Sequence, residues 1–220
     1  MTPGPPPAAS RAVPTRKGGR AQARGDRTRS AIIGETVRCV NEEGFAAASA
    51  NHIAERAGVT WGVIQYHFGD RNGLLAAVVT HGYRQFRSAI ASVAVPEGPD
   101  RERVAAVVDA AWAAFASPES LASLEILVAT RAGRHRTQAA ELESMARDMR
   151  GLGGMLVGPA RSGGGDRAVL GEVLWATLRG MALSQMLSPR PLDTRAERDV
   201  LVDLLTAFIE SSPAPRGSRR

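Results

Sequence analysis

The stretch of sequence that decides the fold is SANHIAERAGVTWGVIQYHFGDRNGLL, residues 49–75. Its apolar residues recur at steps of three and four, which predicts two short helices at about residues 50–57 and 61–67. Between them, Gly58 can adopt the positive φ that a tight turn requires, and Thr60 can cap the second helix. Two short helices joined by such a turn are a helix-turn-helix unit.

One face of the second helix is not expected to pack in the core. Its exposed residues are expected to be Thr60, Trp61, Gly62, Val63, Tyr66 and His67. A helix with an uncovered face fits the major groove of DNA, which is about 12 Å wide. The unit is therefore a candidate for DNA binding.

Helical periodicity continues on both sides of the unit, and strand-like alternation is absent. A first helix is predicted from about Thr28 to Glu43, and a long helix from near Asp70 to just before Pro96. Five further helices are predicted at about 100–116, 118–132, 137–157, 166–187 and 194–211. We therefore expect an all-α fold.

Composition and charge narrow the class of protein. The 220 residues are 44% apolar and 23% charged, as is typical of a globular chain. Residues 1–30 hold seven basic residues and one acidic residue, whereas residues 31–215 hold 18 basic and 21 acidic residues. Because residues 1–26 and 212–220 lack hydrophobic periodicity, we expect a disordered basic arm and a disordered tail.

Several classes of protein are disfavoured. No apolar run reaches the ~18 residues of a spanning helix and the start has no signal-peptide h-region, so we expect a cytoplasmic protein. The single cysteine, Cys39, cannot supply a multi-thiolate metal site, and His52 and His81 have no partner at ligand spacing in the sequence. The motifs His-Glu-x-x-His, Gly-x-x-x-x-Gly-Lys and Gly-x-Ser-x-Gly are absent. We therefore expect no metal, no cofactor and no enzyme activity.

The order of the motifs in this region is typical of one family. The chain carries, in sequence, Gly44-Phe45, Ile53-Ala54, Ala57-Gly58-Val59-Thr60, Gly62-Val63-Ile64-Gln65-Tyr66-His67-Phe68 and Asp70-Arg71-Asn72-Gly73-Leu74-Leu75. Residues 28–75 therefore resemble the DNA-binding domain of the tetracycline-repressor (TetR) family. The resemblance implies a homodimeric transcriptional regulator with an N-terminal three-helix helix-turn-helix domain. A long helix would join it to a C-terminal helical domain that dimerises and binds a small effector.

The resemblance also implies which residues contact double-stranded DNA. They are Ser49, Asn51, Thr60, Trp61, Gly62, Val63, Gln65, Tyr66, His67 and Arg71. Ser49 and Thr60 stand at positions of phosphate contact, and Arg71 stands where the family usually has a phosphate-binding lysine. Gln65 replaces a usual tyrosine, and Val63 a usual threonine or alanine, so direct readout of bases is expected to be modest.

The second half of the chain supplies candidates for an effector site and a dimer interface. For a pocket that takes a largely apolar effector, with core packing as the alternative, the candidates are Phe86, Trp112, Phe115, Glu125, Met145, Met149 and Met181. For the interface, the candidates on the last two helices are Leu174, Leu178, Met181, Leu201, Leu204, Leu205 and Phe208. Packing within one subunit would give the same apolar stripes.

We therefore predict a ligand-released repressor that binds a palindromic operator as a homodimer. Its parts would be a basic arm (1–26), a helix-turn-helix domain (27–75), an effector-binding and dimerisation domain (76–211) and a tail (212–220). One alternative is a constitutive DNA-binding regulator without a small-molecule ligand. Another is a helical enzyme or chaperone with an incidental helix-turn-helix, which predicts no footprint on DNA.

Overall fold

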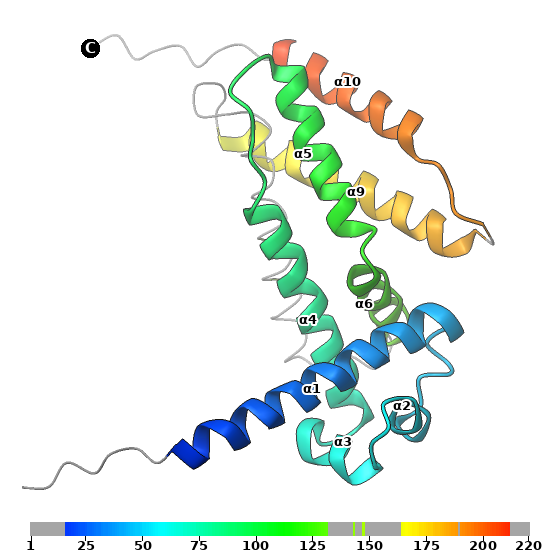
Figure 1. Cartoon of the computed structure of the whole chain (residues 1–220). Helices are drawn as coiled ribbons and strands as arrows, with labels where there is room; N and C mark the ends of the chain where they lie inside the picture. The colour runs from blue at the N-terminus through cyan, green and yellow to red at the C-terminus, as the bar shows by residue number, and fades with distance from the viewer. Residues whose placement is uncertain (1–15, 132–142, 144–146, 148–163, 189, 212–220) are drawn as a thin grey trace, which may run out of the picture.

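Figure 1 shows the computed structural model of the chain, which describes residues 16–131, 143, 147, 164–188 and 190–211. Within these residues the chain is helical and has no strand, as predicted. The helices are α1 (Arg16–Glu43), α2 (Ala50–Arg56), α3 (Trp61–Phe68), α4 (Arg71–Ala91), α5 (Asp100–Phe115), α6 (Pro118–Ala129), α9 (Gly164–Leu187) and α10 (Arg195–Ser211). Most of the helix predicted at 137–157, with Met145 and Met149, lies outside the described residues. No described helix combines the length and the apolar character needed to span a membrane.

The first three helices pack with the start of α4 around one apolar core, called here the first core. One fully buried residue comes from each of these four helices: Ile32, Ile53, Ile64 and Leu74. Gly58 has a φ of +63° between α2 and α3. Ser49 and Asp70 cap α2 and α4 by accepting hydrogen bonds from backbone N–H groups. The predicted helix-turn-helix is therefore present.

Helix α1 begins at Arg16, so the prediction of disorder is wrong for residues 16–26. Sequence periodicity missed this part of the helix because none of residues 22–30 is buried; Arg24 and Arg27, for example, are exposed. Forming the first turn of a helix is unfavourable, and packing of residues 32–40 in the first core stabilises that turn. The helix then extends toward its N-terminus through alanine, glutamine and arginine, each of which costs little free energy in a helix. Residues 1–15 lie outside the described residues.

Helices α5, α9 and α10 form a second core with the far half of α4, at the end of the molecule opposite α2 and α3 (Figure 1). An aromatic cluster lies within it. The ring centroids of Phe86 and Phe115 are 5.0 Å apart, and those of Phe115 and Trp175 are 4.6 Å apart. Three helices far apart in sequence are thereby held together.

Helices α4 and α6 connect the two cores. Helix α4 begins beside α3 and extends into the second core (Figure 1). It packs closely on α6, since a Cβ atom added at Gly82 would lie 2.2 Å from Ser123 Oγ and 2.6 Å from the carbonyl oxygen of Glu119. Ala122 and Ile126 of α6 are buried in the first core. The helix-turn-helix domain is thus completed by residues beyond its predicted boundary.

Candidate nucleic-acid interface

Helix α3 is anchored on one side and exposed on the other. Ile64 is fully buried, whereas Tyr66 is 85% exposed. Gly62 and Gln65 are exposed as well. Thr60 is the N-cap residue of α3, but its hydroxyl group makes no capping hydrogen bond. The helix therefore presents a hydroxyl, an amide and a phenol ring to solvent.

Trp61, Val63 and His67 are half-buried, although the sequence pattern predicted that they would be exposed. Trp61 and Val63 pack against the first core. The His67 ring lies edge-on to the Tyr66 ring, with centroids 5.0 Å apart. Because α3 is only two turns long and packs against both α2 and α4, few of its side chains are fully exposed. These three residues support the exposed face and keep only part of their surface accessible.

The start of α2 carries the other predicted DNA contacts. Ser49 and Asn51 are exposed. The Ser49 hydroxyl accepts a hydrogen bond of 3.3 Å from the backbone N–H of His52. Because a hydroxyl both accepts and donates, this cap leaves the Ser49 O–H available to donate to a phosphate oxygen.

Arg71 has a role that the sequence did not predict. Its guanidinium donates to the carbonyl oxygens of Ala48, at 2.7 Å, and Phe45, at 3.3 Å. It also lies 4.7 Å from the centroid of the Phe45 ring. Arg71 thus fixes the loop between α1 and α2, and its predicted contact with phosphate stays a prediction. Sequence spacing could not reveal this, because the loop and Arg71 meet only in the fold.

Arg56 joins α2 to α1 through three carboxylates. Its Nε lies 2.7 Å from Glu35 Oε1, its Nη2 lies 2.6 Å from Glu42 Oε2, and its Nη1 pairs with Glu43. Hydrogen bonds from Arg38 and Arg56 hold the pKa of Glu35 below its usual value. The carboxylates in turn raise the pKa of Arg56. This network fixes the angle at which α2 leaves the first helix.

His52 also has a partner that the sequence analysis missed. Its Nε2 lies 2.8 Å from Glu43 Oε2, and hydrogen bonds from His52 and Arg56 lower the pKa of Glu43. The two residues stand on different helices and nine positions apart, a separation that no helical spacing rule covers.

The candidate effector residues do not share one pocket. Phe86 and Phe115 are buried and form the aromatic cluster with Trp175, so they fill the second core. Met181 packs against the same core. Trp112 lines a hollow of about 460 Å³ between α5, α6 and the start of α10. Trp112 therefore lies where a ligand could reach it directly, and Glu125 lines a second hollow, of about 550 Å³, with Leu121 and Gln185.

Glu125 faces the helix-turn-helix domain and not the interior of the second domain. Its Oε1 accepts a hydrogen bond of 2.5 Å from the backbone N–H of Phe45. Glu125 thus holds the loop between α1 and α2 from the side of α6, and its place in an effector pocket stays a prediction. Nearby, Asn41 Nδ2 donates to the carbonyl oxygen of Pro118, which adds a second bond between α1 and α6.

The candidate dimer residues divide into two groups. Leu174, Leu178, Leu201 and Leu205 are buried in the second core of a single chain, and Leu201 and Leu205 also line the floor of the groove described below. Packing within one subunit, the alternative for the apolar stripes, holds for these four. Leu204 and Phe208 are 64% and 44% exposed.

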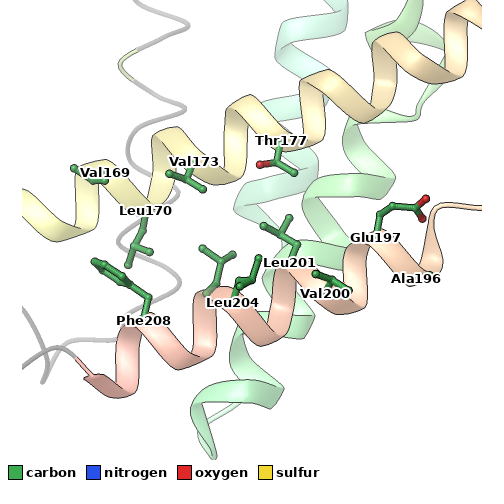
Figure 2. A pocket seen from close by; sticks show the side chains of 11 residues that line it. Val169, Leu170, Val173, Thr177, Ala196, Glu197, Val200, Leu201, Leu204 and Phe208 are labelled. Carbon is green, nitrogen blue, oxygen red and sulfur yellow. The ribbon is translucent and has the colours of Figure 1, made fainter.

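Five exposed apolar residues of α9 and α10 line one groove, which Figure 2 shows from close by. Val169 and Val173 come from α9, and Val200, Leu204 and Phe208 from α10. The groove has a volume of about 600 Å³. Each helix has one apolar stripe in the core and another beside it, which the sequence alone did not separate, and the dimer interface stays a prediction.

The geometry of this region agrees with comparisons to known proteins. Residues 32–78, from the buried part of α1 into α4, match the model of the family described as bacterial regulatory proteins, tetR family. Residues 32–78 are therefore similar to this family. The match confirms the resemblance drawn from the motifs between Gly44 and Leu75. It covers the tetR-family helix-turn-helix and leaves the second core outside.

Individual proteins similar to this chain include transcriptional regulators. The HTH-type transcriptional regulator BetI of Escherichia coli is 39% identical over 83 residues, which are 37% of this chain and 43% of BetI. The chain thus matches less than half the length of these curated relatives. A transcriptional regulator from Rhodococcus sp. Rha1 superposes with a TM-score of 0.65 at 21% identity, over 85% of this chain and 99% of the other. The TetR family transcriptional regulator PfmR from Thermus thermophilus gives a TM-score of 0.60 at 17% identity, over 80% and 93%. The two solved structures show a shared fold.

Proposed function

We propose that this chain is a transcriptional regulator that binds duplex DNA through α3 and represses transcription until an effector releases it. The observation that carries the proposal is the contrast within α3, where Ile64 is fully buried and Tyr66 is 85% exposed. A helix with its side chains is about 10–12 Å across, which suits the width of a major groove. An anchored helix with a polar and aromatic outer face is what such a groove accepts.

Each exposed residue then has a role. The hydroxyl groups of Ser49, Thr60 and Tyr66 donate to phosphate oxygens and so set the register of the protein on the duplex. Gln65 reads a base edge, since its amide can pair with adenine in a bidentate manner. Gly62 allows the backbone of α3 to approach the bases closely, because it has no side chain.

The proposed regulator acts as a homodimer. A second copy would cover the groove of Val169, Val173, Leu204 and Phe208, which is apolar and open in the single chain. An isologous contact of this kind has two-fold symmetry, so the operator would be palindromic. Its half-sites would lie one helical turn apart, about 34–36 Å between centres.

Effector release would act through the loop between α1 and α2. Arg71 of α4 bonds the carbonyl oxygen of Phe45, and Glu125 of α6 bonds its N–H group. A movement of α4 or α6 therefore pulls on the loop that precedes α2 and α3. The hollow beside Trp112 is lined by Leu121 of α6, so a largely apolar effector bound there would contact this helix. Effector and DNA must then weaken each other's binding by the same factor.

The substitution Tyr66→Ala tests the proposal. An operator is first selected from a random duplex library with the full chain, and affinity is then measured by fluorescence anisotropy. Loss of a hydrogen bond to a charged group costs about 1.5–3 kcal/mol, which weakens binding by roughly 10- to 150-fold. Leu187→Ala is the matched control, because Leu187 is also 85% exposed and lies at the far end of α9. Equal affinity of the two variants would exclude α3 as the DNA-contacting helix.

A further inference from the structure

A cluster of three potential metal ligands lies between α1 and α2. The ligand atoms of Cys39, Glu43 and His52 all lie within 4.8 Å of one another. Cys39 is fully buried, His52 is half-buried and Glu43 is at the surface. The thiol therefore lies below the surface, and the other two ligands reach solvent.

The placement of the three side chains follows from the helices. Cys39 and Glu43 are one turn apart on α1, so they lie on the same side of that helix. His52 is in the first turn of α2, and its Nε2 is 2.8 Å from Glu43 Oε2. The other oxygen of Glu43, Oε1, pairs with Arg56. A metal ion can therefore take the place of the proton between Nε2 and Oε2 while the ion pair with Arg56 stays intact.

The surrounding charge favours a dication. Glu35, Glu42 and Glu43 face the two guanidinium groups of Arg38 and Arg56. Three carboxylates against two cations leave one net negative charge, and a cysteine thiolate would make two. A divalent ion neutralises this charge, whereas a buried thiolate without a cation would be costly.

We propose that Cys39, Glu43 and His52 bind a divalent metal ion of the zinc class. One sulfur, one imidazole nitrogen and one carboxylate oxygen suit Zn²⁺ and Co²⁺, while Mg²⁺ and Ca²⁺ require oxygen ligands. Three protein ligands leave a fourth position for water. Because Cys39 binds as the thiolate, metal binding releases the thiol proton to solvent.

The ion would connect α1 to the first helix of the helix-turn-helix. Arg56 already joins these helices, and the metal adds a second link one turn nearer the start of α2. Metal binding would therefore stabilise the folded chain. His52 lies in the same turn as the proposed DNA contacts Ser49 and Asn51, but metal binding can be measured without DNA.

Cobalt titration of the full chain tests this inference. Protein freed of metal with a chelator is titrated with Co²⁺, and the thiolate-to-cobalt charge-transfer band is recorded. Cys39 is the only cysteine of the chain, so any such band reports on it. We expect a saturable band of one Co²⁺ per chain that Zn²⁺ displaces, a rise in melting temperature with Zn²⁺, and loss of the band in Cys39→Ser.

Two histidine variants keep the test decisive if Cys39→Ser fails to fold. His52→Ala alters a half-buried side chain at the rim and is expected to weaken Co²⁺ binding by about tenfold or more. His81→Ala, on α4 and away from the cluster, is expected to bind as the unchanged chain does. Absence of the charge-transfer band in the unchanged chain would overturn the inference, and so would equal Co²⁺ affinity of His52→Ala and His81→Ala.

Discussion

Replacing Gly82 by alanine tests whether α4 and α6 are packed as one rigid unit. The added methyl group would lie 2.2 Å from Ser123 Oγ and 2.6 Å from the carbonyl oxygen of Glu119. The Ser123 hydroxyl can rotate away, but the Glu119 carbonyl belongs to the backbone of α6. Normal contact then requires the two helices to separate by roughly 1 Å.

The magnitude follows from two opposing effects. Overpacking of this kind costs about 1–3 kcal/mol. Alanine is favoured over glycine in a helix by about 0.5–1 kcal/mol. We expect a net loss of about 1–2 kcal/mol, which lowers the melting temperature of a chain of this size by about 2–8 °C. Circular dichroism at a fixed protein concentration measures this change.

Gly34→Ala in α1 is the matched control. A Cβ atom at Gly34 meets nothing within 4 Å, so this variant has the gain in helix propensity without the clash. Its melting temperature is expected to rise. If Gly82→Ala raised the melting temperature as much as Gly34→Ala, the close contact between α4 and α6 would be refuted.

Two further outcomes are expected from surface and charge. Leu204→Asp places a charge in the apolar groove of α9 and α10, so sedimentation should show monomers at concentrations where the unchanged chain is dimeric. Leu187→Asp is the control and should stay dimeric. If Leu204→Asp were dimeric as well, the interface would lie elsewhere. The ion pairs with Arg56 contribute to the lowered pKa values of Glu35 and Glu43. These pairs therefore stabilise the fold at pH values above the ordinary carboxyl pKa of 4.5, and the stabilisation is lost as the pH falls through the lowered pKa values. The melting temperature of Arg56→Gln should therefore fall less steeply between neutral and acid pH than that of the unchanged chain, and parallel curves would contradict this role of Arg56.

The sequence was sufficient for features that depend on local order along the chain. Apolar spacing located α2, α3 and α4, and Gly58 and Ser49 have the turn and cap roles that their residue types indicate. These features need no knowledge of what lies across the fold. The motifs around α3 were equally local, and the family match confirms their interpretation.

Features that depend on distant contacts were not accessible. Arg71 and Glu125 were assigned to phosphate and effector, yet both bond the loop at Phe45. The residue types alone allow either a ligand contact or a contact within the chain, and only the fold shows that both side chains bond this loop. Likewise, periodicity gave the apolar stripes of α9 and α10 without revealing that Leu205 is covered within the chain and Leu204 is not.

The burial of Ala122 and Ile126 in the first core has a consequence for engineering. A fragment that ends with α4 would leave the α6-facing side of that core open to water. The helix-turn-helix domain is therefore not a separable module. A chimaera that joins it to the second domain of another protein should retain α6 from this chain. A domain exchange made at the end of the helix-turn-helix motif would remove the contacts of Ala122 and Ile126 with the first core.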